Sequence, residues 1–320
     1  MQATVLGAGS IGSTIAYDLA TGTLNVDVNL VDIDEAKARG HAIDATHATA
    51  HSSHPVGRTG DDTDDGGSVT AKPPGPEALA GADCIVMAAS APRPEDAEDR
   101  GSRVKWLEGN LDVVADVSGW MRDVDPKPIL VVTNPMDVIT HRLYQQSGWP
   151  RECFLGYSLS ETARLADHLA RAFETTHRAV SCPVLGEHGE NMVPLFSRAS
   201  VDGEPVDLSA EEKQNALDYT RSIPFDVISM RGSSESSRWV TGRGAAQIVR
   251  TILDGGPDEP VDLATPLEGE YGYEDVCLSV PVRFDETGVT EILEWELSEW
   301  ERDRLEEAYR SVRADLSTVE

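Results

Sequence analysis

Lysine is scarce in this sequence, with only 5 lysines among 27 basic residues, whereas 56 residues are acidic. The formal net charge is −29, and the acidic residues are spread along the whole chain. A dispersed excess of this kind indicates a hydrated, self-repelling surface that concentrated salt screens. We interpret it as adaptation to high salt, and the lack of lysine argues against the alternative, an ordinary acidic protein. No basic stripe is present, which excludes nucleic acid as an expected partner.

Cysteine pairs and long apolar runs are also missing. The four cysteines are Cys84, Cys153, Cys182 and Cys277. None forms a C-x-x-C pair, which excludes a zinc ribbon or a redox motif of that type. His47, His51 and His54 have helix-like spacing, but no carboxylate or cysteine stands near them at a spacing known from metal sites, so we expect no bound metal. No apolar run is long enough for a membrane span and no leader pattern precedes the first strand, so we expect a soluble, cytoplasmic protein without membrane contact.

The first half of the chain alternates short apolar runs with helical patterns. Strands are predicted for residues 3–6, 26–31, 83–89 and 128–133, and helices for 13–20 and 103–124. Such alternation indicates βαβ units and a parallel sheet. The stretch 52–76, rich in Gly, Ser, Asp, Thr and Pro, is expected to hold turns around at most one short strand.

The second half has a mixed pattern. Helices are predicted for residues 159–173, 210–231, 235–253 and 298–316, and strands for 178–185, 196–201, 277–284 and 291–296. We therefore predict an α/β fold, with a Rossmann-type doubly wound parallel sheet over residues 1–143. A mixed α+β domain would follow over residues 144–320.

A glycine motif lies at the predicted junction of the first strand and first helix. Residues 7–12 read Gly-Ala-Gly-Ser-Ile-Gly, which is G-x-G-x-x-G. In this context the first glycine permits the tight turn, the second lets the backbone approach a pyrophosphate, and the third lets the helix pack on the strand. The predicted dinucleotide-binding residues here are Gly7, Gly9, Ser10, Ile11 and Gly12. A plain glycine-rich turn is the alternative.

Asp32 ends the second predicted strand, twenty residues after Gly12. A carboxylate at this point accepts hydrogen bonds from ribose hydroxyls and repels a 2′-phosphate. The sequence therefore predicts NAD as cofactor in preference to NADP.

His188 is a candidate proton donor, flanked by Gly186 and Gly189 at the end of a predicted strand. Reduction of a ketone by hydride needs a proton at the oxygen, and histidine supplies one near neutral pH. A carboxylate should hold the other ring nitrogen and stabilise the imidazolium form.

Glu161 and Arg164 are three positions apart on one predicted helix and so share a face. As an isolated pair they would be an ordinary surface ion pair. As part of a site, Glu161 would orient His188, and Arg164 would grip a substrate carboxylate with its planar guanidinium.

Over its whole length the sequence resembles the L-malate/L-lactate dehydrogenase family, and its haloarchaeal members in particular. The matching motifs, in chain order, are residues 7–12, 31–32 (Val-Asp), 91–93 (Ala-Pro-Arg), 133–135 (Thr-Asn-Pro), 161–164 (Glu-Thr-Ala-Arg), 186–189 (Gly-Glu-His-Gly) and the tail from 280 to 295. The resemblance implies an NAD-dependent oxidoreductase acting on a small 2-hydroxy acid.

The resemblance also implies residue roles. His188 resembles the proton donor and acceptor, and Arg164 the arginine that binds the carboxylate common to all substrates. Arg103, seven residues before Asn110, resembles the arginine that polarises the carbonyl. Asn134 resembles a residue near both nicotinamide and substrate, and Asn110 a cofactor-binding residue. Arg93 resembles the specificity position, where arginine pairs with the second carboxylate of malate.

Two departures from the family pattern stand out. Glu161 occupies a position where the family has Asp, so its longer side chain requires a shifted helix or rotamer to reach His188. The segment from Arg93 to Arg103 is longer than usual and very acidic, and Arg100 is an alternative to Arg103 in the polarising role. Such a lengthened segment would rebuild the lid over the substrate.

Arg93 favours malate and oxaloacetate, because an unpaired arginine facing a methyl group would be costly. The lengthened segment keeps lactate and pyruvate as the alternative. An NAD-dependent glycosidase and a non-catalytic nucleotide-binding regulator are more remote readings. From the resemblance we also expect a homo-oligomer, a tetramer or a dimer, whose assembly depends on salt because like charges oppose association.

Overall fold

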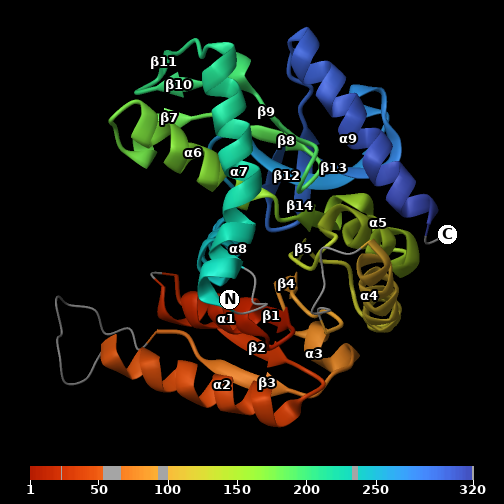
Figure 1. Cartoon of the computed structure of the whole chain (residues 1–320). Coiled ribbons are helices and arrows are strands. Elements are labelled where there is room, and N and C mark those ends of the chain that lie inside the picture. Colours follow the sequence, from red (N-terminus) through yellow and green to blue (C-terminus); the bar gives the residue numbers. More distant parts are fainter. Residues whose placement is uncertain (23, 53–65, 93–99, 233–236, 319–320) are drawn as a thin grey trace.

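A computed structural model describes residues 1–22, 24–52, 66–92, 100–232 and 237–318, with only the backbone of 52 and 100–105 (Figure 1). The first half alternates strands and helices as predicted. Its elements are β1 (Gln2–Leu6), α1 (Ser10–Thr21), β2 (Asp27–Val31), α2 (Glu35–Thr49), β3 (Val69–Lys72), α3 (Pro76–Ala80), β4 (Cys84–Met87), α4 (Arg100–Met121), β5 (Ile129–Val131), α5 (Met136–Ser147) and β6 (Phe154–Gly156).

These strands form a parallel sheet in the order β3-β2-β1-β4-β5-β6. This is the order of the doubly wound dinucleotide-binding fold, whose ligand site lies beyond the carboxyl ends of the strands where the order reverses. The reversal falls between β1 and β4. The predicted fold class is therefore confirmed, and the glycine motif lies at the ligand-binding edge of the sheet.

The second half has a mixed composition. Its elements are α6 (Leu159–Ala172), β7 (Val180–Ser181), β8 (Val184–Gly186), β9 (Met192–Pro194), β10 (Ser200–Val201), β11 (Glu204–Pro205), α7 (Ala210–Arg231), α8 (Arg238–Leu253), β12 (Val261–Glu268), β13 (Glu274–Asp285), β14 (Gly288–Ile292) and α9 (Glu299–Ser317). The antiparallel strands β12, β13, β8 and β9 continue the sheet beyond β6, and β7, β10 and β11 form a small separate sheet.

Some predicted strands of this half are wrong in detail. Residues 196–201 contain a single 3-10 turn, Phe196–Arg198, and only two residues of strand. The predicted strand 178–185 is divided between a 3-10 turn, β7 and the start of β8, and β14 ends at Ile292. In each case the apolar residues of the segment do not belong to one continuous strand.

Two apolar clusters stabilise the fold among the residues that the structure describes. The larger one follows the sheet and the helices that cover it, among them α1 and α8, which pack against each other (Figure 1). The smaller one joins α6, α7, β8 and β9 through residues such as Leu165, Val184 and Leu217. None of the described helices combines the length and apolar character that crossing a bilayer requires.

Candidate active site

The turn between β1 and α1 is built on glycine for steric reasons. Gly7 has φ +98°, and a Cβ atom there would lie 2.6 Å from the amide nitrogen of Ala89. A Cβ on Gly12 would overlap the carbonyl oxygen of Gly7, whereas one on Gly9 would meet nothing within 4 Å. Gly7 and Gly12 therefore close the turn, and Gly9, the residue before α1, leaves open space at the helix N-terminus, where a pyrophosphate would fit.

Asp32 lies beside this turn, at the carboxyl end of β2. Its Oδ2 accepts a hydrogen bond from the Ala8 amide at 2.7 Å, and its Oδ1 accepts one from Asp34 at 2.9 Å. Lys37 is 3.6 Å from Oδ2. The carboxylate is thus held in place, and each oxygen retains a lone pair for a ribose hydroxyl.

The residues after β4 and β5 are clamped to α4. The buried Asn110 accepts a hydrogen bond from the Ala91 amide and donates one to the Asn134 carbonyl, both at 2.7 Å. The Trp106 indole donates to the Ala91 carbonyl at 3.0 Å. Asn110 thereby ties two loops at the ligand-binding edge of the sheet, and the exposed Asn134 lies at that edge.

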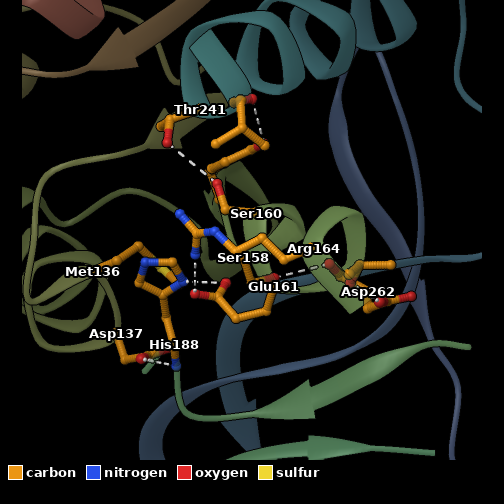
Figure 2. A network of polar contacts seen from close by, with 12 residues as sticks. Met136, Asp137, Ser158, Ser160, Glu161, Arg164, His188, Thr241 and Asp262 are labelled. Atoms are coloured by element: carbon orange, nitrogen blue, oxygen red, sulfur yellow. Dashed lines mark hydrogen bonds and ion pairs between the residues drawn. The ribbon is translucent and has the colours of Figure 1, made fainter. Parts of the chain in front are cut away.

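His188, Glu161 and Arg164 meet at the start of α6 (Figure 2). His188 Nδ1 is 2.8 Å from Glu161 Oε2, and Arg164 donates to Glu161 Oε1 at 3.3 Å. The three side chains are only 16, 9 and 14 % exposed, respectively. The longer side chain of Glu161 therefore reaches the imidazole, and His188 Nε2 is left to exchange a proton.

Charge within this group sets the ionisation of its members. Burial alone would lower the pKa of His188, but the Glu161 carboxylate, with Asp137, outweighs burial and raises it. Burial alone would raise the pKa of Glu161, but His188 and Arg164 outweigh burial and lower it. The arrangement therefore favours an imidazolium–carboxylate pair.

Asp137 is a site residue that the sequence analysis missed. It lies in the first turn of α5, is 3 % exposed, and accepts a hydrogen bond from the His188 amide at 2.8 Å (Figure 2). Burial raises its pKa to about 7, although the positive charge of His188 opposes the rise. No local sequence pattern marks it, because its contact spans 51 positions of the chain.

Two predicted substrate-binding arginines cannot be placed against this group. Arg93 lies outside the described residues, as do most of the acidic segment after it and His54. Arg103 lies in α4, seven residues before Asn110, and its side chain is outside the described part.

Comparison with known proteins finds one family over almost the whole chain. A family model described as the NAD-binding domain of lactate/malate dehydrogenase matches residues 1–156, and one described as the α/β C-terminal domain of the same family matches residues 161–320.

Individual relatives cover nearly the full length. A malate dehydrogenase of Haloarcula marismortui is 31 % identical over 94 % of this chain and 93 % of its own. An L-lactate dehydrogenase of Salinibacter ruber is 28 % identical over 98 % of this chain and 96 % of its own. The solved structure of a malate dehydrogenase from Salinibacter ruber superposes with a TM-score of 0.85 at 26 % identity, covering 100 % of this chain and 97 % of its own.

Proposed function

The chain belongs to the lactate/malate dehydrogenase family, and from that premise we propose that its buried Glu161–His188–Arg164 group carries out the acid–base chemistry of an NAD-dependent malate dehydrogenase. The family catalyses reversible hydride transfer between NAD(H) and a 2-oxo or 2-hydroxy acid. This membership decides against a glycosidase and against a non-catalytic regulator. The single observation that carries the residue assignment is the 2.8 Å contact between His188 and Glu161.

His188 is the proposed proton donor in reduction and acceptor in oxidation. With Nδ1 against Glu161, the Nε2 proton passes to the substrate oxygen as the carbonyl becomes an alcohol. Glu161 holds the ring in one orientation and stabilises its charged form, as a carboxylate partner does in other imidazole-based sites.

Arg164 is proposed to bind the carboxylate that all substrates of this class share. Its guanidinium fits that group in a bidentate manner. Arg103 would polarise the carbonyl, and Asn134 would contact both substrate and cofactor. Together these contacts would place the carbonyl oxygen next to His188.

The glycine turn and Asp32 are proposed to hold NAD. Gly7, Gly9, Ser10, Ile11 and Gly12 supply the open helix N-terminus, and Asp32 accepts the ribose hydroxyls, while Asn110 fixes the loops beside the cofactor. When bound, NAD accepts or supplies the hydride. We assign residues 1–143 to this cofactor-binding role and residues 144–320 to substrate binding and acid–base chemistry.

Malate and oxaloacetate are the proposed substrate pair. Support comes from Arg93, a cation suited to a second carboxylate, and from the haloarchaeal relative named malate dehydrogenase. Lactate and pyruvate are the second candidate, supported by the lengthened segment between Arg93 and Arg103 and by the relative named L-lactate dehydrogenase.

Steady-state reduction of oxaloacetate and of pyruvate by NADH, compared through kcat/KM in multimolar salt, tests this choice. Malate dehydrogenase activity predicts a large preference for oxaloacetate, which the Arg93→Gln substitution should reduce or reverse. A large preference of the unsubstituted enzyme for pyruvate would overturn the malate assignment and leave the dehydrogenase family intact.

The enzyme is further proposed to be cytoplasmic, adapted to high salt and a homo-oligomer, either a tetramer or a dimer. The net charge of −29 supports an assembly that needs cations or high salt. Light scattering over a salt series should show dissociation at low salt. A mass that stays constant down to dilute buffer would contradict this part of the proposal.

A further inference from the structure

The His188–Glu161 contact joins α6 to the turn after β8, and the strands next to these two elements are connected by little pairing. β6, the strand before α6, pairs with β12 through Ala264 and Gly156, and the ladder between β13 and β8 is equally short in the described part of the chain. Apolar packing between α6 and β8 is non-directional. Neither interaction by itself sets the two side chains at a hydrogen-bonding distance.

Asp262, on β12, connects the two elements directly. Its Oδ2 accepts a hydrogen bond from the Thr162 hydroxyl at 3.0 Å and another from the Val184 amide at 2.9 Å. Thr162 is the residue after Glu161, and Val184, the first residue of β8, lies four residues before His188. One carboxylate oxygen thus binds next to both partners of the catalytic pair.

The start of α6 is also attached to the backbone of Asp262. Ser158 is the N-cap residue of α6, and residues 158–161 match the capping-box pattern S-x-x-E. Ser158 forms no side-chain cap and instead donates its hydroxyl to the Asp262 carbonyl at 2.9 Å (Figure 2). Glu161 is thereby left to contact His188, and the helix start is fastened to β12.

Asp262 occupies this place at an energetic cost. It is 7 % exposed, and burial raises its pKa, which the amide of Val184 and the hydroxyl of Thr162 partly offset. Both of these donors are neutral, and no basic side chain in the described part of the chain forms an ion pair with Asp262. A buried carboxylate in such surroundings is poor at stabilising a fold. A role in geometry explains its presence better than a role in stability.

We propose that Asp262 is a positioning residue, which sets the distance between Glu161 and His188 by binding α6 and β8 through one oxygen. The inference rests on the proposed function, since it concerns the alignment of the pair that moves the proton. Asp262 acts through Thr162 and Val184 and does not touch the substrate.

The experiment compares Asp262→Ala, Asp262→Asn and Thr162→Val with the unsubstituted enzyme in the same salt. An asparagine can place its carbonyl oxygen where Oδ2 lies and keep both hydrogen bonds, whereas alanine loses both and Thr162→Val loses only the bond to α6. Leu263→Ala is the matched control, because it opens a cavity on the same strand and leaves both bonds intact.

Two readouts are needed. The first is kcat/KM for the 2-oxo acid, with the Kd for NADH measured separately. The second is the titration of the His188 imidazole by NMR of histidine-labelled protein, with His188→Gln to assign the signal. The charged groups that face this imidazole are Glu161 and Arg164 on α6 and Asp137 on α5. The titratable group beside Asp262 itself is the Cys182 thiol.

Asp262→Ala should lower kcat/KM by about 100-fold, the order expected for a misplacement of about 1 Å, and leave NADH binding unchanged. His188 should titrate at lower pH, because its contact with Glu161 is loosened. In Asp262→Asn, kcat/KM and the pH at which His188 titrates should both be close to those of the unsubstituted enzyme. In Thr162→Val, both should lie between the values of the unsubstituted enzyme and those of Asp262→Ala.

Asp262 is merely structural if His188 titrates normally in Asp262→Ala and only the melting temperature falls, as in Leu263→Ala. If Asp262→Ala does not fold, an unchanged titration and unchanged kcat/KM in Thr162→Val overturn the proposal equally well. Failure of the proposed function is distinguishable, because the unsubstituted enzyme would then lack activity while the NMR titration still reports on Asp262.

Discussion

Replacing Glu161 by glutamine removes a negative charge and changes little in side-chain size. His188 then loses the carboxylate 2.8 Å from its Nδ1, and Arg164 loses its partner at 3.3 Å. Because Glu161 is only 9 % exposed, solvent screens this charge weakly. A hydrogen bond to a charged group contributes about 1.5–3 kcal/mol, and the Coulomb attraction at 2.8 Å and an effective dielectric constant of about 20 is about 6 kcal/mol before the cost of desolvation is subtracted. Between these two figures we expect a net loss of about 2–4 kcal/mol.

This loss falls on the transition state of proton transfer, in which the imidazole charge changes. It corresponds to a decrease in kcat of about 30- to 1000-fold. The pKa of His188, which Glu161 raises against the effect of burial, should fall as well. Since reduction uses protonated His188, the rate of the variant should decline with rising pH earlier than that of the unsubstituted enzyme.

The assay is NADH-dependent reduction of oxaloacetate and pyruvate over a pH series, with NADH binding measured by fluorescence. NADH affinity should be unchanged, because the Glu161 side chain contacts His188 and Arg164 and is not among the residues of the proposed cofactor site. Glu211→Gln, the same change on the exposed surface of α7, is the control and should behave like the unsubstituted enzyme. Retained turnover with an unaltered pH profile in Glu161→Gln would remove Glu161 from the site.

Other substitutions and a pH profile test the remaining parts of the site. Gly12→Ala should destabilise the fold by about 3 kcal/mol in thermal unfolding, because its Cβ would overlap the Gly7 carbonyl. Gly9→Ala should fold normally and bind NADH more weakly, because a Cβ there meets nothing within 4 Å. Equal stability of the two variants would contradict the steric argument. Arg164→Gln should lower kcat/KM by about 100-fold or more through loss of the charged hydrogen bonds to the substrate carboxylate, and an unchanged KM would count against that contact. In the unsubstituted enzyme, kcat/KM for reduction should fall as pH rises through the pKa of His188, which lies above its ordinary value of 6.5; a fall below pH 6.5 would be inconsistent with the Glu161 pair. Asp32→Ala should raise the KM for NADH and reduce the preference for NADH over NADPH, because the carboxylate that binds the ribose hydroxyls is lost. Measurement of kcat/KM with each of the two cofactors tests this expectation.

The sequence predicted those parts of the fold that depend on local signals. The helix predicted for residues 210–231 coincides with α7, because Ser209 and Glu212 form a capping box at its start and Gly232, with φ +63°, ends it. The glycine motif likewise predicted the turn between β1 and α1, since the steric requirement lies within a few residues.

Elements whose identity depends on distant packing were missed. β12 was not predicted, because six consecutive buried residues, including Asp262 and Thr265, give it no apolar–polar alternation. The same reason hid Asp262 as a candidate site residue. The spacing of Glu161 and Arg164 indicated that they share a helix face, but their meeting with His188 results from the order of strands in the sheet.

The double anchoring of Ala91 has a consequence for how this enzyme can be altered. Its amide binds Asn110 and its carbonyl binds Trp106, and both partners lie on α4, the helix to which the chain returns after residue 99. The two ends of the intervening segment are therefore held at a fixed separation by one rigid element. The entropy cost of closing a chain segment between two fixed ends grows only slowly with the length of the segment. Under the proposed role of residues 93–99 in substrate choice, exchanging them for a shorter segment from a relative should change which acid is accepted while leaving the melting temperature nearly unchanged.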